Sequence, residues 1–217
     1  MKEKKLDAAW ESLVQKYNLS TQQLTQFKLY LDQLVAWNNK FNLTAITDSL
    51  EVIAYHFDDS LILSRFLDLK SLNTIADVGS GGGFPGLPLK ILYPHLKLVL
   101  IEVNGKKVEF LKNLSSSLGL QDVIVEQLDW RAFIREGVYP IDLFCARASL
   151  QVDELLRIFK PGCVYKNSKL VYWAAQNWGE SSYVGWILSR YNYTVGNRER
   201  KLVLFPAEST QSWILKK

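Results

Sequence analysis

The spacing of hydrophobic residues changes near residue 73 and divides the chain into two parts. Before this point, apolar side chains recur every three or four residues, which is the period of amphipathic helices. Such helices are predicted at about residues 6–17, 21–37 and 50–61. From Thr74 onward, short apolar runs alternate with helix-like segments. We therefore expect a helical extension over residues 1–72 that packs on a second unit over residues 73–217.

Polar residues mark where two of these helices begin. Ser20 with Gln23, and Asp48 with Glu51, have the spacing of capping boxes. Between the two helices, residues 37–46 are rich in asparagine, whose side chain bonds to its own backbone and interrupts regular structure. This segment is predicted to be a loop, which is either simply packed or lines a site.

The apolar runs of the second part predict a sheet of seven strands. Five runs are expected to be parallel strands, at residues 74–78, 97–101, 123–125, 141–145 and 169–173. One helix is expected to begin at Leu87 and a second after a cap at Asn104, and two more are expected over residues 150–159 and 178–190. Residues 191–195 and 201–205 are expected to form a final strand pair. Alternating strands and helices indicate an α/β fold with a mostly parallel sheet covered on both faces.

The turn after the first predicted strand has five glycines in eight residues, from Gly79 to Gly86. A glycine turn between a strand and a helix lets backbone amides approach a ligand closely. It is not a phosphate-binding P-loop, because no Gly-Lys pair is followed by Ser or Thr. It also lacks the dinucleotide fingerprint, because Phe84 stands where the third glycine is required.

The glycine spacing fits a third class of ligand. Gly79, Gly81 and Gly83 alternate with other residues, directly after Asp77-Val78. This order resembles the first motif of class I S-adenosylmethionine-dependent methyltransferases. The amino acid end of that cofactor carries an ammonium, which an acid at the strand tip can meet, and a carboxylate, which glycine amides can meet. We therefore predict that Asp77, Gly79, Gly81 and Gly83 bind S-adenosylmethionine.

Two further strand ends supply the remaining parts of a nucleoside site. Glu102 closes the second strand, 25 residues after Asp77, and a carboxylate there can accept hydrogen bonds from both ribose hydroxyls. Asp129 and Trp130 follow the third strand. An acid and a backbone amide at this position can read the adenine edge, while the Trp130 ring either stacks on adenine or belongs to the core.

Composition narrows the range of functions. The chain has 217 residues and a net charge of +4, which is compatible with a nucleic-acid partner. Its two cysteines form no CxxC pair and there are only two histidines, so neither a disulfide framework nor a metal site is expected. The first residues lack a signal peptide's apolar core, and no apolar run approaches the length of a membrane span. We expect a cytoplasmic protein that is monomeric by default.

Over about residues 20–205 the chain resembles the bacterial 16S ribosomal RNA guanine-N7 methyltransferases, a family also called glucose-inhibited division protein B. The resemblance rests on several segments: Trp37-Asn38, Asn42-Leu43-Thr44-Ala45-Ile46, His56 with Asp59-Ser60, Asp77 to Pro88, Gly105-Lys106-Lys107-Val108, Ala146-Arg147-Ala148 and Arg200-Lys201-Leu202-Val203. The Asn-Leu-Thr segment and the Phe84-Pro85-Gly86 extension are absent from most other methyltransferases.

The resemblance implies roles for individual residues. By the family pattern, the cofactor is contacted by Gly79, Phe84, Trp130, Arg131 and Arg147. The basic candidates for contact with ribosomal RNA or the small ribosomal subunit are Lys106, Lys107, Arg198, Arg200, Lys201, Lys216 and Lys217. Arg200 and Lys201 are favoured, because the family match includes them. The chain departs from the family where Thr47, Tyr55 and Ala174 stand in place of basic residues.

The implied chemistry needs no general base. Guanine N7 has an exposed lone pair at neutral pH, so catalysis is expected to come from in-line positioning of N7, methyl group and sulfur. Arg147 is the candidate catalytic residue, as a group that orients the cofactor or the guanine. The alternative is a surface arginine that caps the next helix.

Three functions remain open at this stage. The first is methylation of guanine N7 in small-subunit RNA. The second is a divergent class I methyltransferase that acts on another RNA, a protein or a small molecule. The third is a non-catalytic protein that binds the cofactor.

Overall fold

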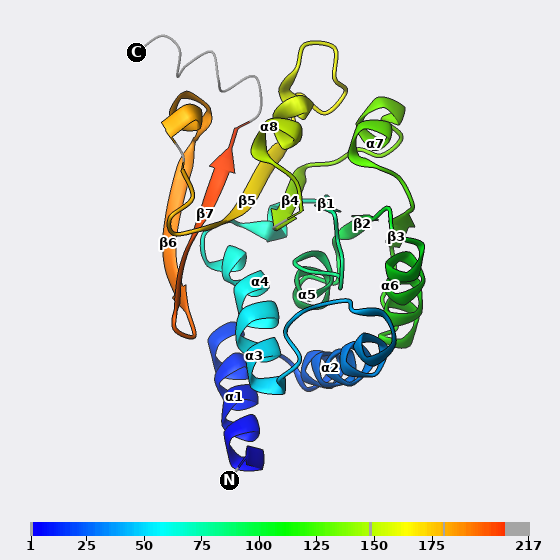
Figure 1. The fold of residues 1–217 in the computed structure, drawn as a ribbon, viewed down its shortest axis with the longest axis vertical. Helices are drawn as coiled ribbons and strands as arrows, with labels where there is room; N and C mark the ends of the chain where they lie inside the picture. Colours follow the sequence, from blue (N-terminus) through cyan, green and yellow to red (C-terminus); the bar gives the residue numbers. More distant parts are fainter. Residues whose placement is uncertain (1, 148, 180, 207–217) are drawn as a thin grey trace.

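A computed structural model describes residues 2–147, 149–179 and 181–206. Within these ranges, seven strands form one sheet in the order β3-β2-β1-β4-β5-β7-β6 (Figure 1). The strands are β1 (Thr74–Val78), β2 (Lys97–Ile101), β3 (Val123–Glu126), β4 (Leu143–Arg147), β5 (Lys169–Ala175), β6 (Ser189–Val195) and β7 (Arg198–Phe205). Strands β1 to β5 are parallel, and β7 runs antiparallel to both β5 and β6. The predicted mostly parallel, seven-stranded α/β sheet is confirmed.

Helices cover both faces of the sheet, as predicted (Figure 1). One face packs on α1 (Lys2–Tyr17), α2 (Thr21–Phe41), α5 (Gly86–Leu92), α6 (Gly105–Ser117) and the helical stretch of α3 (Ser49–Val52), a π-helical turn (Ile53–Asp58), α4 (Asp59–Leu61) and a 3₁₀ turn (Ile62–Arg65). The other face packs on α7 (Trp130–Glu136), α8 (Val152–Leu155) and the 3₁₀ turn that continues α8 (Leu156–Phe159). A short 3₁₀ turn (Leu69–Ser71) precedes β1.

The N-terminal helices share one core with the sheet. Buried side chains from Trp10 in α1 to Leu204 in β7 form a continuous cluster. Its centre is aromatic: the Phe57 ring lies 5.0 Å from Phe27 and 5.2 Å from Tyr30, and Tyr30 stacks on Phe84 of the glycine turn. Burial of large aromatic side chains is a major source of stability. The helices therefore hold the glycine turn from one side, while the division into units 1–72 and 73–217 stays a prediction.

Local sequence signals set several boundaries correctly. Ser20 and Gln23 form the predicted capping box, and Asn104 caps α6 through the N–H groups of Lys106 and Lys107. The Asp48 side chain accepts the N–H groups at the start of α3. These side chains satisfy amides that a helix start leaves without partners.

Three predicted boundaries were wrong. Strand β4 begins two residues late, because the Asp142 carboxylate accepts the N–H groups of Asn73 and Thr74 at the start of β1. Helix α2 continues to Phe41, where Asn42 ends it in a left-handed conformation. Residues 178–190 are not a helix: a 3₁₀ turn occupies Ser181–Trp186, and β6 then pairs with β7.

None of the helices in the described parts of the chain is both long and apolar enough for a membrane crossing.

Candidate cofactor cavity and arginine cluster

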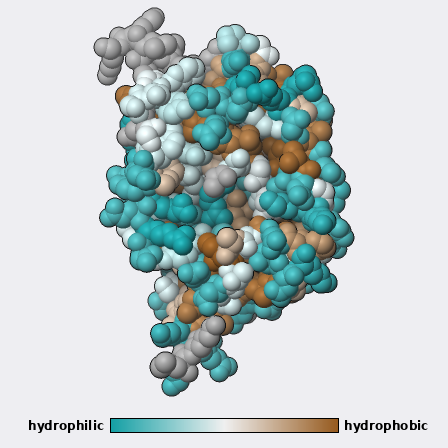
Figure 2. Space-filling view, viewed as in Figure 1, coloured by the Kyte–Doolittle hydropathy of each residue, from teal (hydrophilic) through white to brown (hydrophobic). Residues whose placement is uncertain are grey.

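A cavity of about 310 Å³ opens at the carboxyl edge of the sheet. Its wall comes from the ends of four strands: Val78 and Gly79, Ile101 to Val103 with Lys107, Leu128 to Trp130, and Ser149 with Leu150. The strand order reverses between β1 and β4, and open α/β sheets bind ligands at such a switch point. Figure 2 shows a hollow near the centre of this face, with hydrophilic side chains on the β6–β7 side. Four predicted cofactor residues, Gly79, Glu102, Asp129 and Trp130, therefore meet in one cavity.

The carboxylate of Glu102 holds the glycine turn in place. The N–H of Gly81 donates to Glu102 Oε2 at 2.9 Å, and the N–H of Asn104 donates to Oε1 at 2.9 Å. Gly79 and Ser80 donate to the carbonyl of Ile101 on the same strand. A carboxylate has about four acceptor sites, so these two bonds leave Glu102 able to accept hydroxyl donors from the cavity.

Position 79 requires a glycine both for its backbone conformation and for lack of space for a side chain. Its φ of +67° lies in the left-handed region, and a Cβ atom there would stand 2.5 Å from Cβ of Ser149. The loop after β4 thus contacts the glycine turn directly. Ser149 Oγ is buried and has no hydrogen-bond partner within the described residues. Because buried hydroxyls rarely lack partners, this orphaned atom beside the cavity fits a polar ligand.

Asp77 lies beneath the turn and is not part of the cavity wall. Its Oδ2 accepts the N–H of Gly86 at 2.9 Å, while the buried Oδ1 has no partner in the described part of the chain. Burial raises the pKa of Asp77 to about 7, although the Gly86 hydrogen bond and Arg147 oppose this shift. The structure therefore places Asp77 as a support of the turn, and a direct contact with an ammonium remains a prediction.

The segment after β3 forms α7, a helix that the sequence analysis did not predict. Asp129 caps this helix through the N–H of Ala132 and lines the cavity. Trp130 is 6% exposed, and its Nε1 donates to the carbonyl of Glu154 at 2.6 Å, so most of its indole belongs to the core. The side chain of Arg131 is 64% exposed, binds Glu154 through two hydrogen bonds and does not line the cavity.

Arg147 stands at the end of β4 and is not a surface arginine. Its Nη1 donates to Asp59 Oδ2 at 3.0 Å and to the carbonyl of Tyr55 at 2.9 Å, and its Nη2 donates to His56 Nδ1 at 2.9 Å. The guanidinium also lies 5.2 Å from the centre of the Phe84 ring. The helical stretch 53–61 thus fixes Arg147 beside the glycine turn, and its positioning role stays a prediction.

Asp59 provides the buried negative charge that faces Arg147 and Arg200. We call Tyr55, His56, Asp59, Arg147 and Arg200 together the arginine cluster. The Asp59 side chain is fully buried, and its Oδ1 accepts the Tyr193 hydroxyl at 2.6 Å and lies 3.5 Å from Arg200 Nε. Its carbonyl accepts Nε1 of Trp173 at 2.8 Å. Asp59 therefore joins the N-terminal helices to β4, β5, β6 and β7. Its role was not predicted, because its partners are remote in sequence.

His56 connects the cluster to the glycine turn. Its ring stacks on Phe84 with centroids 4.3 Å apart, and its Nε2 lies 2.8 Å from Thr44 Oγ1. Arginine can only donate, so Nδ1 accepts from Arg147 and the proton of the neutral ring belongs on Nε2. Burial and Arg147 lower the pKa of His56 to about 3, which keeps the ring neutral at pH 7.

This lowered pKa predicts how stability depends on pH. Between about pH 6.5 and pH 3, His56 binds a proton in the unfolded chain but not in the folded one, so acid favours unfolding. Relative to a His56→Gln variant, the wild type should lose up to about 1.4 kcal/mol per pH unit below pH 6.5. Urea unfolding at several pH values measures this difference. A difference that stays constant between pH 7 and pH 4.5 would contradict the assignment.

The predicted RNA-binding residues have different surroundings, and Lys216 and Lys217 lie outside the described residues. Lys107 lines the cavity, and the Lys106 ammonium lies 5.2 Å from the centre of the Phe41 ring. Arg200 faces Asp59, and Lys201 is only 9% exposed.

Of the three positions that depart from the family pattern, Thr47 is exposed and Tyr55 half-buried, whereas Ala174 is 1% exposed and packs in the core.

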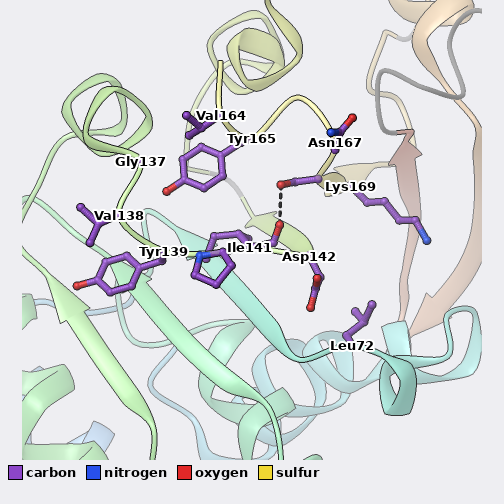
Figure 3. A pocket seen from close by; sticks show the side chains of 12 residues that line it. Leu72, Gly137, Val138, Tyr139, Ile141, Asp142, Val164, Tyr165, Asn167 and Lys169 are labelled. Atoms are coloured by element: carbon purple, nitrogen blue, oxygen red, sulfur yellow. Dashed lines mark hydrogen bonds between the residues drawn. The ribbon is translucent and has the colours of Figure 1, made fainter. Parts of the chain in front are cut away.

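A larger cavity, of about 600 Å³, lies at the opposite edge of the sheet (Figure 3). It is lined by Leu72, Asp142 and Lys169, which stand at the amino ends of β1, β4 and β5. Asp142 is already engaged with the backbone of β1, and the glycine turn lies at the other edge. The smaller cavity is therefore the candidate site.

The strand order, the antiparallel β7 and the glycine turn after β1 define a class I methyltransferase fold. A family model described as rRNA small subunit methyltransferase G (GidB) matches residues 23–181. The chain therefore belongs to this family.

Curated relatives agree with the family match. "Ribosomal RNA small subunit methyltransferase G" of Bacillus subtilis (strain 168) is 40% identical over 159 residues, which cover 71% of this chain and 65% of the relative. The proteins of the same name from Aster yellows witches'-broom phytoplasma and Bacillus licheniformis are 42% identical (68% of this chain, 70% of the relative) and 47% identical (66% and 61%). The chain thus aligns with about two thirds of each relative's length.

Solved structures share the fold. A structure titled "Human methyltransferase 10 domain containing protein" has a TM-score of 0.56 at 10% identity and covers 83% of this chain and 96% of that chain. A point mutant of MtNAS in complex with S-adenosylmethionine has a TM-score of 0.52 at 11% identity, with 91% of this chain and 84% of that chain covered. At such low identity these likenesses concern the fold alone.

Proposed function

We propose that this protein is an S-adenosylmethionine-dependent methyltransferase that methylates N7 of a guanine in 16S ribosomal RNA of the small subunit. The observation that carries the proposal is the cavity at the switch point, where Gly79, Glu102 and Asp129 meet. Family membership supports the acceptor, because the curated relatives are named as small-subunit ribosomal RNA methyltransferases. The atom N7 follows from the resemblance described above.

The residues of the cavity fit this cofactor. Glu102 has acceptor capacity for the two ribose hydroxyls, and Asp129, which lines the same cavity, supplies an acceptor for an adenine amino group. The orphaned Ser149 hydroxyl, next to Gly79, offers a further polar contact. When bound, the cofactor supplies a methyl group on a positively charged sulfur.

The protein's own contribution to the reaction is positioning. N7 of guanine is a nucleophile without loss of a proton, so no residue has to act as a base. Arg147, held by Asp59, His56 and the Tyr55 carbonyl, is a rigid donor at the end of β4. We propose that Arg147 orients the guanine. His56 stays neutral and supports Arg147 as an acceptor, so it moves no proton.

A substitution at Gly79 tests the cofactor site. Gly79→Ala should weaken binding of S-adenosylhomocysteine at least about tenfold, because the new Cβ would collide with Ser149. Gly119→Ala is the matched control: its φ is +66°, close to that of Gly79, but its Cβ would meet nothing within 4 Å. Both variants place an alanine at a positive φ, so the difference between their affinities, measured by calorimetric titration, reports the collision with Ser149 alone. Equal affinities for the two variants would contradict the assigned site.

The acceptor is tested with labelled cofactor. The protein is incubated with S-adenosylmethionine carrying a labelled methyl group and, separately, with small ribosomal subunits, total RNA or cell lysate. Label in small-subunit RNA supports the proposal. Label in another RNA, a protein or a small molecule supports the second candidate function, which the exposed Thr47 in place of a basic residue favours. Binding without transfer points to a non-catalytic protein.

A further inference from the structure

The turn of the β6–β7 hairpin contacts the N-terminal helices at the ring of Tyr55. Tyr55, on the π-helical turn, donates its hydroxyl to Asn197 Oδ1 at 2.6 Å. A Cβ atom at Gly196 would lie 2.7 Å from the Tyr55 ring, and the Arg198 guanidinium lies 3.8 Å from the centre of that ring. Three successive residues of the hairpin therefore rest on Tyr55. In Figure 1 this turn lies beside the helices and away from α7 and α8.

Arg198 differs from Arg147 and Arg200 in having no carboxylate partner among the described residues. Arg147 and Arg200 share the buried Asp59 carboxylate. Arg198 is exposed and forms no ion pair within the described part of the chain. Arg198 lies outside the arginine cluster and adds a third guanidinium near its one carboxylate, with its positive charge exposed to solvent.

The Tyr55 ring also limits how Arg198 can bind, because the guanidinium lies over the ring, 3.8 Å from its centre. A guanidinium that lies flat on an aromatic ring keeps its in-plane N–H groups free, and these match two phosphate oxygens at once. Tyr55 links this group to Arg147 as well, because the Tyr55 carbonyl accepts from Arg147 Nη1 at 2.9 Å. The exposed guanidinium is thus held one residue away from the positioning network at the catalytic edge.

We propose that Arg198, stacked on Tyr55, binds a phosphate of the RNA strand that enters the catalytic edge of the sheet. This inference rests on the proposed function, since it takes RNA as the acceptor. It selects Arg198 from the basic candidates that the sequence offered and adds the Tyr55 ring that holds its guanidinium. Arg198 anchors the strand by its backbone and reads no base, because phosphate contacts position a nucleic acid without specifying sequence.

The test is the salt dependence of RNA binding. For a single-stranded segment each phosphate contact contributes about 0.7 to the slope of log affinity against log salt. Arg198→Ala should reduce this slope by about that amount for small-subunit RNA and should leave S-adenosylhomocysteine affinity unchanged. Tyr55→Ala should reduce the slope similarly, whereas Tyr55→Phe, which keeps the ring, should not. Arg135→Ala, at an exposed position on α7, is the matched control and should keep the wild-type slope.

The outcomes separate this inference from the proposed function. If the wild type binds RNA with a salt slope and Arg198→Ala has the same slope, the phosphate contact is wrong and the proposed function stands. If the wild type binds RNA without salt dependence, the phosphate contact is wrong; if it binds neither small-subunit RNA nor small ribosomal subunits, both are wrong. A loss of thermal stability in Arg198→Ala with an unchanged slope assigns Arg198 to holding the hairpin and overturns the contact.

Discussion

Arg147→Ala is expected to reduce the rate of methyl transfer by about 100- to 1000-fold, the range seen when a preorganised donor is removed from an active site. The side chain does not line the cofactor cavity, so the affinity for S-adenosylhomocysteine should change by less than about threefold. The loss should therefore appear in the rate with saturating cofactor. Single-turnover transfer to small-subunit RNA measures it.

Arg147→Lys separates geometry from charge. Lysine keeps the positive charge next to Asp59, but its ammonium cannot bridge Asp59, His56 and the Tyr55 carbonyl as the planar guanidinium does. We expect Arg147→Lys to be nearly as slow as Arg147→Ala. Full activity in Arg147→Ala, measured on protein shown to be folded, would remove Arg147 from the mechanism.

Asp59→Asn is expected to lower the free energy of unfolding by about 3–5 kcal/mol. The substitution leaves Arg147 and Arg200 without their buried counter-charge, and removing one partner of a buried ion pair has costs of this size. Denaturant unfolding of the cofactor-free protein measures the change.

The neighbouring residue provides a matched control. The Asp58 carboxylate pairs with Lys16 at 2.7 Å in a partly exposed position, where ion pairs contribute about 1 kcal/mol or less. Asp58→Asn should therefore cost far less than Asp59→Asn. Equal losses in the two variants would show that the arginine cluster does not depend on the Asp59 charge.

The parts of the fold that the sequence predicted are those set by local signals. The bounds of β1 and β2 match the predicted runs, because both strands lie inside the sheet and every position except Lys97 is buried. The segment after β5 was mispredicted because its structure depends on tertiary contacts. Trp178 stacks on Tyr183 and packs on Tyr172 of β5, and these contacts outweigh a helical spacing of apolar residues.

The same distinction applies to the site. Gly79 and Glu102 could be predicted because each directly follows a strand whose end is visible in the sequence. The pairing of Arg147 with Asp59 and His56 spans 88 to 91 residues, and the hairpin contact of Tyr55 with Asn197 spans 142. No local pattern encodes such contacts, so His56 stayed without a partner until the fold was known.

The modified nucleoside identifies the atom that receives the methyl group. Small ribosomal subunits are incubated with the protein and labelled S-adenosylmethionine, and the 16S ribosomal RNA is then digested to nucleosides and, in parallel, cleaved at N7-methylated guanines. We expect label in 7-methylguanosine and a single cleavage position, both formed about 100- to 1000-fold more slowly with Arg147→Ala. Label in any other nucleoside, or none with folded wild-type protein that binds the cofactor, would contradict it.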